Sequence, residues 1–463
     1  MKFRLEWLGQ YLPGELPGLA TLRRSLTAVG FIVEGTEGEG GGAVLEVELT
    51  ANRPDGMNHR GLAREAACAL GREFRDTPAP EPAEGAAAAA SLAAIAVEEP
   101  ELCSRYSGRV IEGIRVREAA PKVQERLRAL GMNPISAPVD ATNHVLWDIG
   151  QPTHAFDLDT LAKGPDGRPA IVVRRARAGE KLVTLDGIER TLGPEHLVIA
   201  DAARPVALAG VMGGLDTAIT PATTRVLLES AHFNATAVRK TARLLGIHTD
   251  ASHRFERGTD PATTVEGLDH VTELLVADCG GSVAKGLVEA FGREVPRKVV
   301  RLRHARLVSF LGMDVTKERC VAILRALAFG VVETETGVLD VTVPSWRIDV
   351  SQECDLIEEV IRVVGYAELP ETLPHAFNPT WSEPILGRED RARDVLAGAG
   401  FVEACTYSFV SSGENAPFSG AVAGAAPVVA NALGEPFTTM RSTPVIGLLR
   451  SARHNVRRGQ HDL

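Results

Sequence analysis

Four acidic residues that lie close together in the sequence have types and spacing suited to binding a divalent cation. Asp355, Glu358 and Glu359 follow an i, i+3, i+4 pattern, which places three carboxylates on one face of a helix. Asp349 precedes that helix and could join them. Such a cluster repels itself unless a hard cation such as Mg²⁺ or a basic partner neutralises it. A solvated acidic helix start is the alternative, and Arg362 could also pair with the two glutamates, so the residues alone leave both interpretations open.

A second set of residues could bind a polar ligand. Asn143 falls in a predicted helix, and His154 in the loop that follows it. Glu229 ends an apolar run, where a buried carboxylate would need a partner. Gly213 belongs to the glycine-rich string ALAGVMGG (207–214), which lets backbone approach a ligand closely. The alternatives are an exposed helical Asn, a His bonded to a backbone carbonyl, and a strand-end Glu that reaches solvent.

The surrounding sequence divides into segments that must position these residues. Residues 77–91, TPAPEPAEGAAAAAS, lack any amphipathic period and are predicted to be a linker. Before it, residues 1–76 contain two predicted helices and at least two strands, typical of a small α+β domain. Residues 92–295 mix helices with buried strands, and residues 296–373 contain two helices and a hairpin. Residues 374–463 lack a closing element, so we expect an incomplete domain there.

Composition narrows the class of protein. The 463 residues suggest three or four domains, and 44% hydrophobic with 24% charged residues exclude a disordered or collagen-like chain. No apolar run approaches the roughly 20 residues of a membrane span, and no secretory signal is recognisable. The six cysteines show no CxxC spacing, which favours a reducing cytoplasm. With a net charge of −10, any RNA must be held by local patches or by another chain.

Five strings resemble, in order, segments of the β-subunit family of bacterial phenylalanyl-tRNA synthetases. They are LTANRPDGMNHRGLAREAA (49–67), APVDATNHVLWDIGQPTHAFDLDTL (137–161), LAGVMGG (208–214), RFERGTDP (254–261) and DLIEEVIRVVGY (355–366). The resemblance covers nearly the whole chain. It implies an α+β multidomain fold: a small N-terminal α+β domain, a B3/B4 editing domain, a winged-helix-like B5 domain, and the start of a class II synthetase-like antiparallel α/β module.

The resemblance also assigns roles to the second set of residues. Asn143, His154, Gly213 and Glu229 match the family's editing pocket, which hydrolyses mischarged tyrosyl-tRNA. Glu229 would accept a hydrogen bond from the tyrosine hydroxyl that phenylalanine lacks, while Asn143 and His154 would position the ester and a water. A site built to bind a hydroxyl group strongly rejects an analogue without it. This implies an editing deacylase activity in the chain.

Metal and partners are implied in the same way. Asp349, Asp355, Glu358 and Glu359 match positions that ligate a Mg²⁺ shared with the α subunit, which favours the metal interpretation of the acidic cluster. The family's α subunit performs the ATP-dependent attachment of phenylalanine to tRNA(Phe), in a cytoplasmic α2β2 heterotetramer. The resemblance thus implies a ligase subunit with no membrane association.

Two departures from the family pattern accompany the resemblance. Residues 38–42 bridge the position where many bacterial members carry a tRNA-binding OB-fold, so we expect that domain to be absent. Residues 440–459 resemble only the early part of the catalytic-like module, so we expect a truncated chain. Three rival functions stay open: a structural subunit with an idle pocket, a free-standing trans-editing hydrolase, and a nucleic-acid-binding regulator built on residues 315–364, whose acidic face disfavours phosphate contact.

Overall fold

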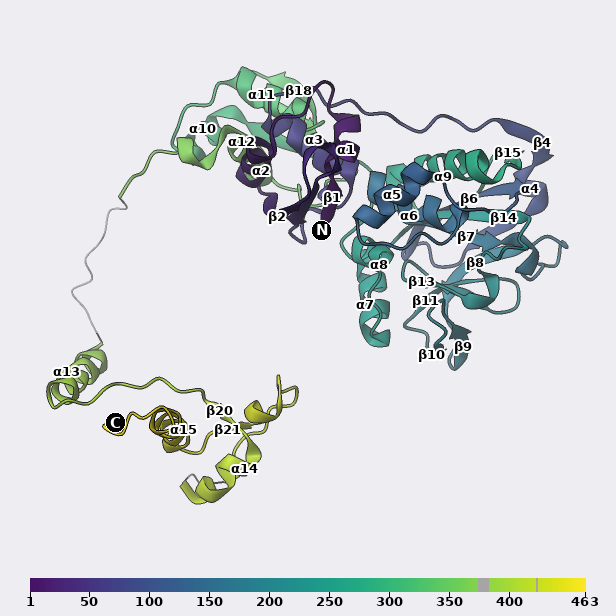
Figure 1. Ribbon diagram of the computed structural model, residues 1–463. Coiled ribbons are helices and arrows are strands. Elements are labelled where there is room, and N and C mark those ends of the chain that lie inside the picture. The colour runs from purple at the N-terminus through teal and green to yellow at the C-terminus, as the bar shows by residue number, and fades with distance from the viewer. Residues whose placement is uncertain (374–382, 422–423) are drawn as a thin grey trace. The chain divides into compact units, whose positions relative to one another are not determined.

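The computed structural model describes residues 1–373, 383–421 and 424–463. It contains two separate compact units, Met1–Glu371 and Thr372–Leu463, which Figure 1 shows coloured along the chain. The predicted sites all fall in the first unit. We divide that unit into a first domain (residues 1–76), a middle domain (residues 84–295) and a third domain (residues 296–371).

The first domain packs helices against a three-stranded sheet of order β1-β3-β2. Its main elements are β1 (Lys2–Arg4), α1 (Leu5–Leu8), α2 (Leu19–Ala28), β2 (Ile32–Glu37), β3 (Val44–Glu48) and α3 (His59–Ala69). β2 and β3 pair antiparallel, with residues 38–43 between them. α3 begins at Asn58, whose side chain accepts a hydrogen bond from the Gly61 amide at 2.7 Å. This cap fixes the start of the helix that carries Arg60 and Arg64.

The segment predicted to be a linker is partly regular. Residues 84–88 form β4 (Glu84–Ala88) and are followed by α4 (Ala89–Leu92). β4 adds in parallel to β15 (Ser282–Lys285) at the edge of the middle domain's larger sheet. Sheet pairing uses backbone groups that every residue carries, so an alanine run with no hydropathy period can still pair. The unstructured part of the predicted linker therefore ends before residue 84.

The middle domain contains two main sheets and a two-stranded sheet formed by β9 (Glu180–Val183) and β10 (Glu189–Leu192), with helices packed around them (Figure 1). The larger sheet comprises β4, β15, β6 (Cys103–Glu112), β14 (Arg225–Phe233) and β7 (Thr153–Asp157), with β16 (Val288–Phe291) paired to β6. The second sheet comprises β13 (Met212–Gly213), β12 (Pro205–Leu208), β11 (Leu197–Ala200), β8 (Ala170–Arg175) and β5 (Ala94–Val97). The domain also contains α5 (Pro121–Ala129), α6 (Ala137–Ile149), α7 (Ala235–Leu245), α8 (Asp250–Phe255) and α9 (Thr264–Cys279).

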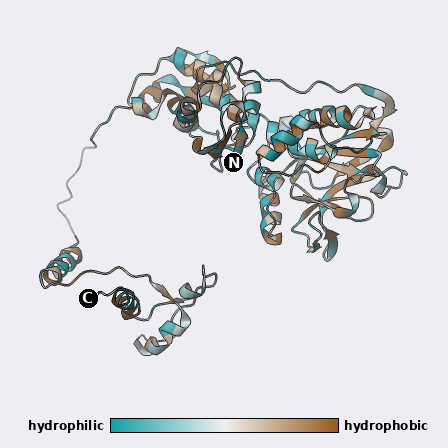
Figure 2. Ribbon diagram, viewed as in Figure 1, coloured by the Kyte–Doolittle hydropathy of each residue, from teal (hydrophilic) through white to brown (hydrophobic). Residues whose placement is uncertain are grey.

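Two apolar cores lie on opposite faces of the larger sheet. One fills the space toward the second sheet and includes Phe156 and Leu227. The other lies under α6 and α9 and includes Ala155 and Leu228. Figure 2 shows the hydrophobic strands of this domain between more hydrophilic helix surfaces. Because successive strand residues point to opposite faces, these core residues reveal which way each neighbouring polar residue points.

The third domain has a three-stranded antiparallel sheet of order β17-β19-β18, packed against three helices. Its elements are β17 (Val299–Arg303), α10 (His304–Leu311), α11 (Lys317–Ala326), β18 (Gly330–Glu335), β19 (Val338–Thr342) and α12 (Glu353–Val364). The apolar face of α12 is buried in this core through Leu356, Val360 and Ile361. The acidic residues of interest therefore lie on or just before α12.

The second unit has few regular elements. They are α13 (Pro384–Gly398), β20 (Phe409–Val410), α14 (Ser412–Asn415), β21 (Thr439–Met440) and α15 (Val445–Val456). β20 and β21 pair antiparallel. Within the described residues of the chain, we find no helix with the length and apolarity needed to cross a bilayer.

Candidate functional site

Glu229 and His154 lie side by side in the larger sheet of the middle domain. β14 pairs antiparallel with β7, and in that register Glu229 is directly opposite His154. Leu228 packs under α6 and α9, whereas Phe156 packs toward the second sheet. By strand alternation, Glu229 and His154 both face the second sheet. The His154 ring also packs edge-on against Phe156, with centroids 4.5 Å apart.

Gly213 brings the second sheet against the same histidine. A Cβ atom at position 213 would lie 2.5 Å from His154 Cε1 and 2.8 Å from Nε2. Only a residue without a side chain leaves the imidazole its present position. Three of the four residues predicted for the ligand site, His154, Gly213 and Glu229, therefore lie together between the two sheets.

Both titratable groups of this site are uncharged at neutral pH. Glu229 is only 6% exposed, and burial raises the pKa of its carboxyl to about 8, with the nearby Tyr106 hydroxyl opposing the rise. Burial lowers the pKa of His154 to about 4. Among the described residues, His154 Nε2 has no hydrogen-bond partner. Buried polar atoms without partners are rare, and a polar ligand would satisfy them.

Asn143 is not brought to this group. It is half-buried on α6. That helix packs through Ala141 and Val145 onto the face of the sheet opposite to the one that carries Glu229. α6 therefore lies on the other face of the sheet, and among the described residues no hydrogen bond joins Asn143 to the other three predicted residues.

Tyr106 is a site residue that the sequence analysis missed. Its register partner is Ala231, which packs toward the second sheet, so Tyr106 faces the same side as Glu229. Gly108, two residues along β6, lies opposite Glu229 itself. The alternation of residues along β6 could have indicated that Tyr106 points to one face of the sheet. Only the register of β6 with β14 shows that this is the face that carries Glu229.

Two of the four predicted metal ligands are bound by arginines. Arg347 donates to both carboxylate oxygens of Asp349, each at 2.9 Å. Glu359 is buried and accepts bonds from Arg362 at 2.8 and 2.7 Å, and a further bond from Arg347. Burial alone would raise the pKa of Glu359, but these guanidinium groups hold it well below its ordinary value. Arg362 also reaches Glu65 on α3, at 2.7 Å.

The other two predicted ligands point elsewhere. The Asp355 carboxylate accepts the Ser351 and Gln352 amides at 2.8 Å each and so caps α12. Glu358 is exposed and makes no ion pair with any described residue. The four carboxylates therefore do not converge, and they fit a metal site in this chain poorly. Arg362 was predicted as an alternative partner of Glu359, whereas Arg347, which binds both Asp349 and Glu359, was not.

Three known domain families match successive segments of the chain. A B3/4 domain model matches residues 102–280, which contain Glu229, His154 and Gly213. A tRNA synthetase B5 domain model matches residues 300–366, and a phenylalanyl-tRNA synthetase β-chain CLM domain model matches residues 369–463. The first two correspond to the middle and third domains of the first unit.

Similarity to characterised proteins runs along most of the chain. The phenylalanine–tRNA ligase β subunit of Anaeromyxobacter dehalogenans is 44% identical over 421 residues, covering 91% of this chain and 52% of that protein. The chain is thus similar to phenylalanine–tRNA ligase β subunits over about half of their length. The β subunits of Geobacter sulfurreducens and Moorella thermoacetica are each 40% identical, covering 91% and 90% of this chain and 52% and 51% of theirs. The chain thus spans about half the length of these β subunits.

Proposed function

We propose that this chain hydrolyses mischarged tyrosyl-tRNA in its B3/4 domain. The observation that supports this most is the buried, uncharged Glu229 directly opposite His154, whose ring fits only because residue 213 is glycine. This arrangement places a polar pair in the otherwise apolar core between the two sheets. Such a pair can recognise a single hydroxyl group.

Glu229 would recognise the tyrosine side chain. Its neutral carboxyl retains a carbonyl oxygen that accepts a hydrogen bond from the phenol, and its O–H can donate. Phenylalanine would leave this buried group unsatisfied. Sites that hydrogen-bond a substrate hydroxyl reject the analogue without it by large factors, far more than a missing methylene allows.

His154 would orient the ester or the attacking water through Nε2. At neutral pH the imidazole is uncharged, so it acts as a hydrogen-bonding group rather than as a cation. The packing carries no role for Asn143, and the proposal depends on the other three residues. Hydrolysis breaks the ester bond between tyrosine and the tRNA ribose, and water supplies the hydroxyl of the released amino acid.

The assembly is proposed on similarity to the relatives. The chain would act in the cytoplasm with a phenylalanyl-tRNA synthetase α subunit in an α2β2 heterotetramer, which binds tRNA(Phe) and uses ATP to attach phenylalanine. A Mg²⁺ shared with the α subunit is predicted by the resemblance. Of the four predicted ligands, Glu358 alone is exposed and forms no ion pair among the described residues.

Co-expression with the α subunit and a tyrosyl-tRNA deacylation assay test the proposal. We expect a stable heteromer that releases tyrosine from tyrosyl-tRNA and loses this activity in Glu229→Ala. Equal rates for wild type and Glu229→Ala would identify a scaffold with an idle pocket. A monomer that deacylates fully without the α subunit would instead identify a free-standing trans-editing hydrolase.

A further inference from the structure

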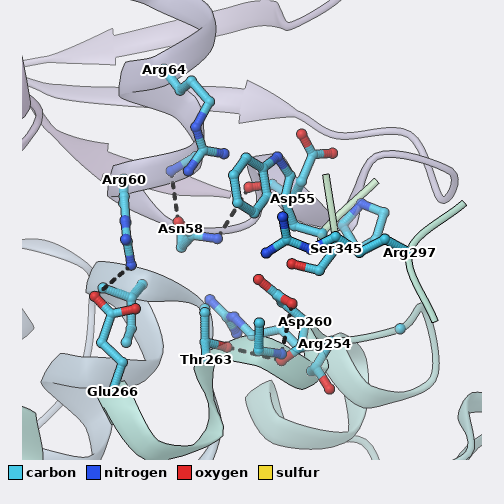
Figure 3. A pocket seen from close by; sticks show the side chains of 18 residues that line it. Asp55, Asn58, Arg60, Arg64, Arg254, Asp260, Thr263, Glu266, Arg297 and Ser345 are labelled. Carbon is cyan, nitrogen blue, oxygen red and sulfur yellow. Dashed lines mark hydrogen bonds and ion pairs between the residues drawn. The ribbon is translucent and has the colours of Figure 1, made fainter. Parts of the chain in front are cut away.

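A cavity of about 160 Å³ lies where the three domains of the first unit meet (Figure 3). The first domain contributes Arg60 and Arg64 from α3, and the middle domain contributes Arg254 and Thr259. The third domain contributes a wall at residues 345–346. Most of these residues belong to the strings 49–67 and 254–261, which the editing proposal does not use. The cavity is separate from the site around Glu229.

Arg64 is a buried guanidinium with no hydrogen-bond acceptor. It is 7% exposed, and among the described residues no carboxylate or carbonyl accepts a bond from it. Its guanidinium lies over the Trp346 ring at 4.0 Å and over the Phe74 ring at 5.2 Å. Stacking fixes the plane of the guanidinium but satisfies none of its N–H donors. Burying a charged guanidinium without an acceptor is unfavourable unless an anion binds to it and accepts its hydrogen bonds.

Arg254, on the opposite wall, is only partly satisfied. It is 2% exposed and donates from Nε to the Met57 carbonyl at 3.2 Å and from Nη1 to the Asp250 carbonyl at 2.9 Å. Its Nη2 and the Thr259 hydroxyl have no partner among the described residues. Burial lowers the pKa of Arg254 to about 10, with the Asp250 carboxylate opposing the fall. Two donors of this wall are therefore left for a ligand.

The acidic residues of the cavity do not supply the missing acceptors. Asp55 is bound by Arg53 through two bonds of 2.9 Å. Glu266 is bound by Arg60 at 2.8 Å. Asp260 accepts the Ala262 amide at 2.9 Å and forms no ion pair within the described part of the chain. Arg254 forms an ion pair with Asp250 at 3.4 Å. Arg64 and Arg297 are the lining arginines without an ion-pair partner among the described residues, against Asp260 alone, so the excess charge is positive.

We propose that this cavity binds a phosphate-type oxyanion, held between Arg64 and Arg254, with Arg297 at its exposed rim. Planar guanidinium groups bind tetrahedral oxyanions through paired N–H···O bonds. The volume equals that of about five water molecules at ~30 Å³ each and is below the roughly 300 Å³ of a drug-sized ligand site. It therefore suits a free phosphate ion or a small phosphate monoester. Each of the three domains contributes one of these arginines, so the bound anion would also join the domains.

Binding of inorganic phosphate to the full chain tests the proposal by isothermal titration calorimetry, with chloride at matched ionic strength as the reference. We expect saturable binding and a rise in melting temperature above that in chloride. Arg64→Met removes the guanidinium that stacks on Trp346 but keeps a long apolar side chain at that position. It should weaken phosphate binding at least tenfold, since hydrogen bonds to a charged group are worth about 1.5–3 kcal/mol. Arg297→Gln, at an exposed position, should weaken it as well and leaves folding untouched.

The control is Arg24→Gln, which removes an exposed arginine of α2 far in sequence from the cavity lining. It should bind phosphate as the wild type does. A parallel titration with phenyl phosphate distinguishes the two ligand sources: binding of both compounds indicates a monoester site, and binding of phosphate alone indicates a site for the free ion. Absence of saturable binding beyond chloride, or equal binding by the wild type and both cavity variants, would overturn the proposal.

Discussion

Glu229 lies directly opposite His154 across the β7–β14 ladder, and both side chains face the second sheet of the middle domain. Residues opposite one another in an antiparallel pair have Cβ atoms about 4.5–5.5 Å apart. A carboxyl and an imidazole at this separation would normally form an ion pair. Here burial keeps the first protonated and the second neutral at pH 7, so the pair can bind an uncharged hydroxyl group.

The pKa of Glu229 predicts how stability changes with pH. Because the folded-state value of about 8 lies above the ordinary value of 4.5, the folded state binds the extra proton between these pH values. The contribution of Glu229 to the free energy of unfolding is therefore full below about pH 4.5 and is lost as pH rises toward 8. Relative to Glu229→Gln, wild type should lose on the order of 3–5 kcal/mol between pH 5 and pH 9. Urea unfolding at both pH values measures this, and parallel pH profiles would show that the carboxyl is not buried in its neutral form.

Gly213→Ala should disable the site by displacing His154. The new methyl group would lie 2.5 Å from the imidazole, so the ring or β13 must move. We expect a loss of about 1–3 kcal/mol in stability and a tenfold or greater fall in the rate of tyrosyl-tRNA hydrolysis. Gly42→Ala adds the same methyl group at an exposed position where it meets no atom within 4 Å, and should change neither. If Gly213→Ala hydrolysed tyrosyl-tRNA at the wild-type rate, the proposed role of His154 would be wrong.

The arginine network between α3 and α12 should dominate the docking of the first and third domains. Arg362 bonds to Glu65, 297 residues away in sequence, and to Glu359. Arg362→Met leaves two buried carboxylates short of a partner, a change that typically costs about 3–5 kcal/mol. Lys181→Met removes one side of the exposed Lys181–Glu189 pair and should have little effect. Guanidinium chloride unfolding compares them, and equal midpoints would show that the buried network contributes nothing.

The acidic residues near α12 should not make the isolated chain depend on Mg²⁺. Asp349 and Glu359 are bound by arginines, and Asp355 caps the helix. Removing divalent ions with a chelator should leave the melting temperature of the chain unchanged, whereas Glu359→Gln should lower it equally with and without Mg²⁺. A Mg²⁺-dependent rise in melting temperature that Glu359→Gln abolishes would establish the metal site and contradict the arginine pairing.

Hydropathy patterns in the sequence predicted elements that have a buried apolar face. The helix that carries Asp355, Glu358 and Glu359 was predicted, and it spans Glu353–Val364. β4 was missed because an alanine-rich edge strand pairs through backbone groups alone. Contacts between distant residues were missed for a different reason: the partnership of Arg347 with Glu359 and the position of Tyr106 opposite Ala231 depend on the packing and register of separate elements. Asn143 was assigned by resemblance, and its place in the site stays a prediction.

The most direct test of the account is the selectivity of the B3/4 site for tyrosine over phenylalanine. The rates of deacylation of tyrosyl-tRNA and phenylalanyl-tRNA are measured side by side, with wild type and Glu229→Ala in complex with the α subunit. If Glu229 binds the phenol hydroxyl, wild type should hydrolyse tyrosyl-tRNA at least a hundredfold faster, and Glu229→Ala should lose most of that ratio. A ratio that is unchanged in Glu229→Ala, or a wild type that hydrolyses both esters alike, would contradict the assignment of this site.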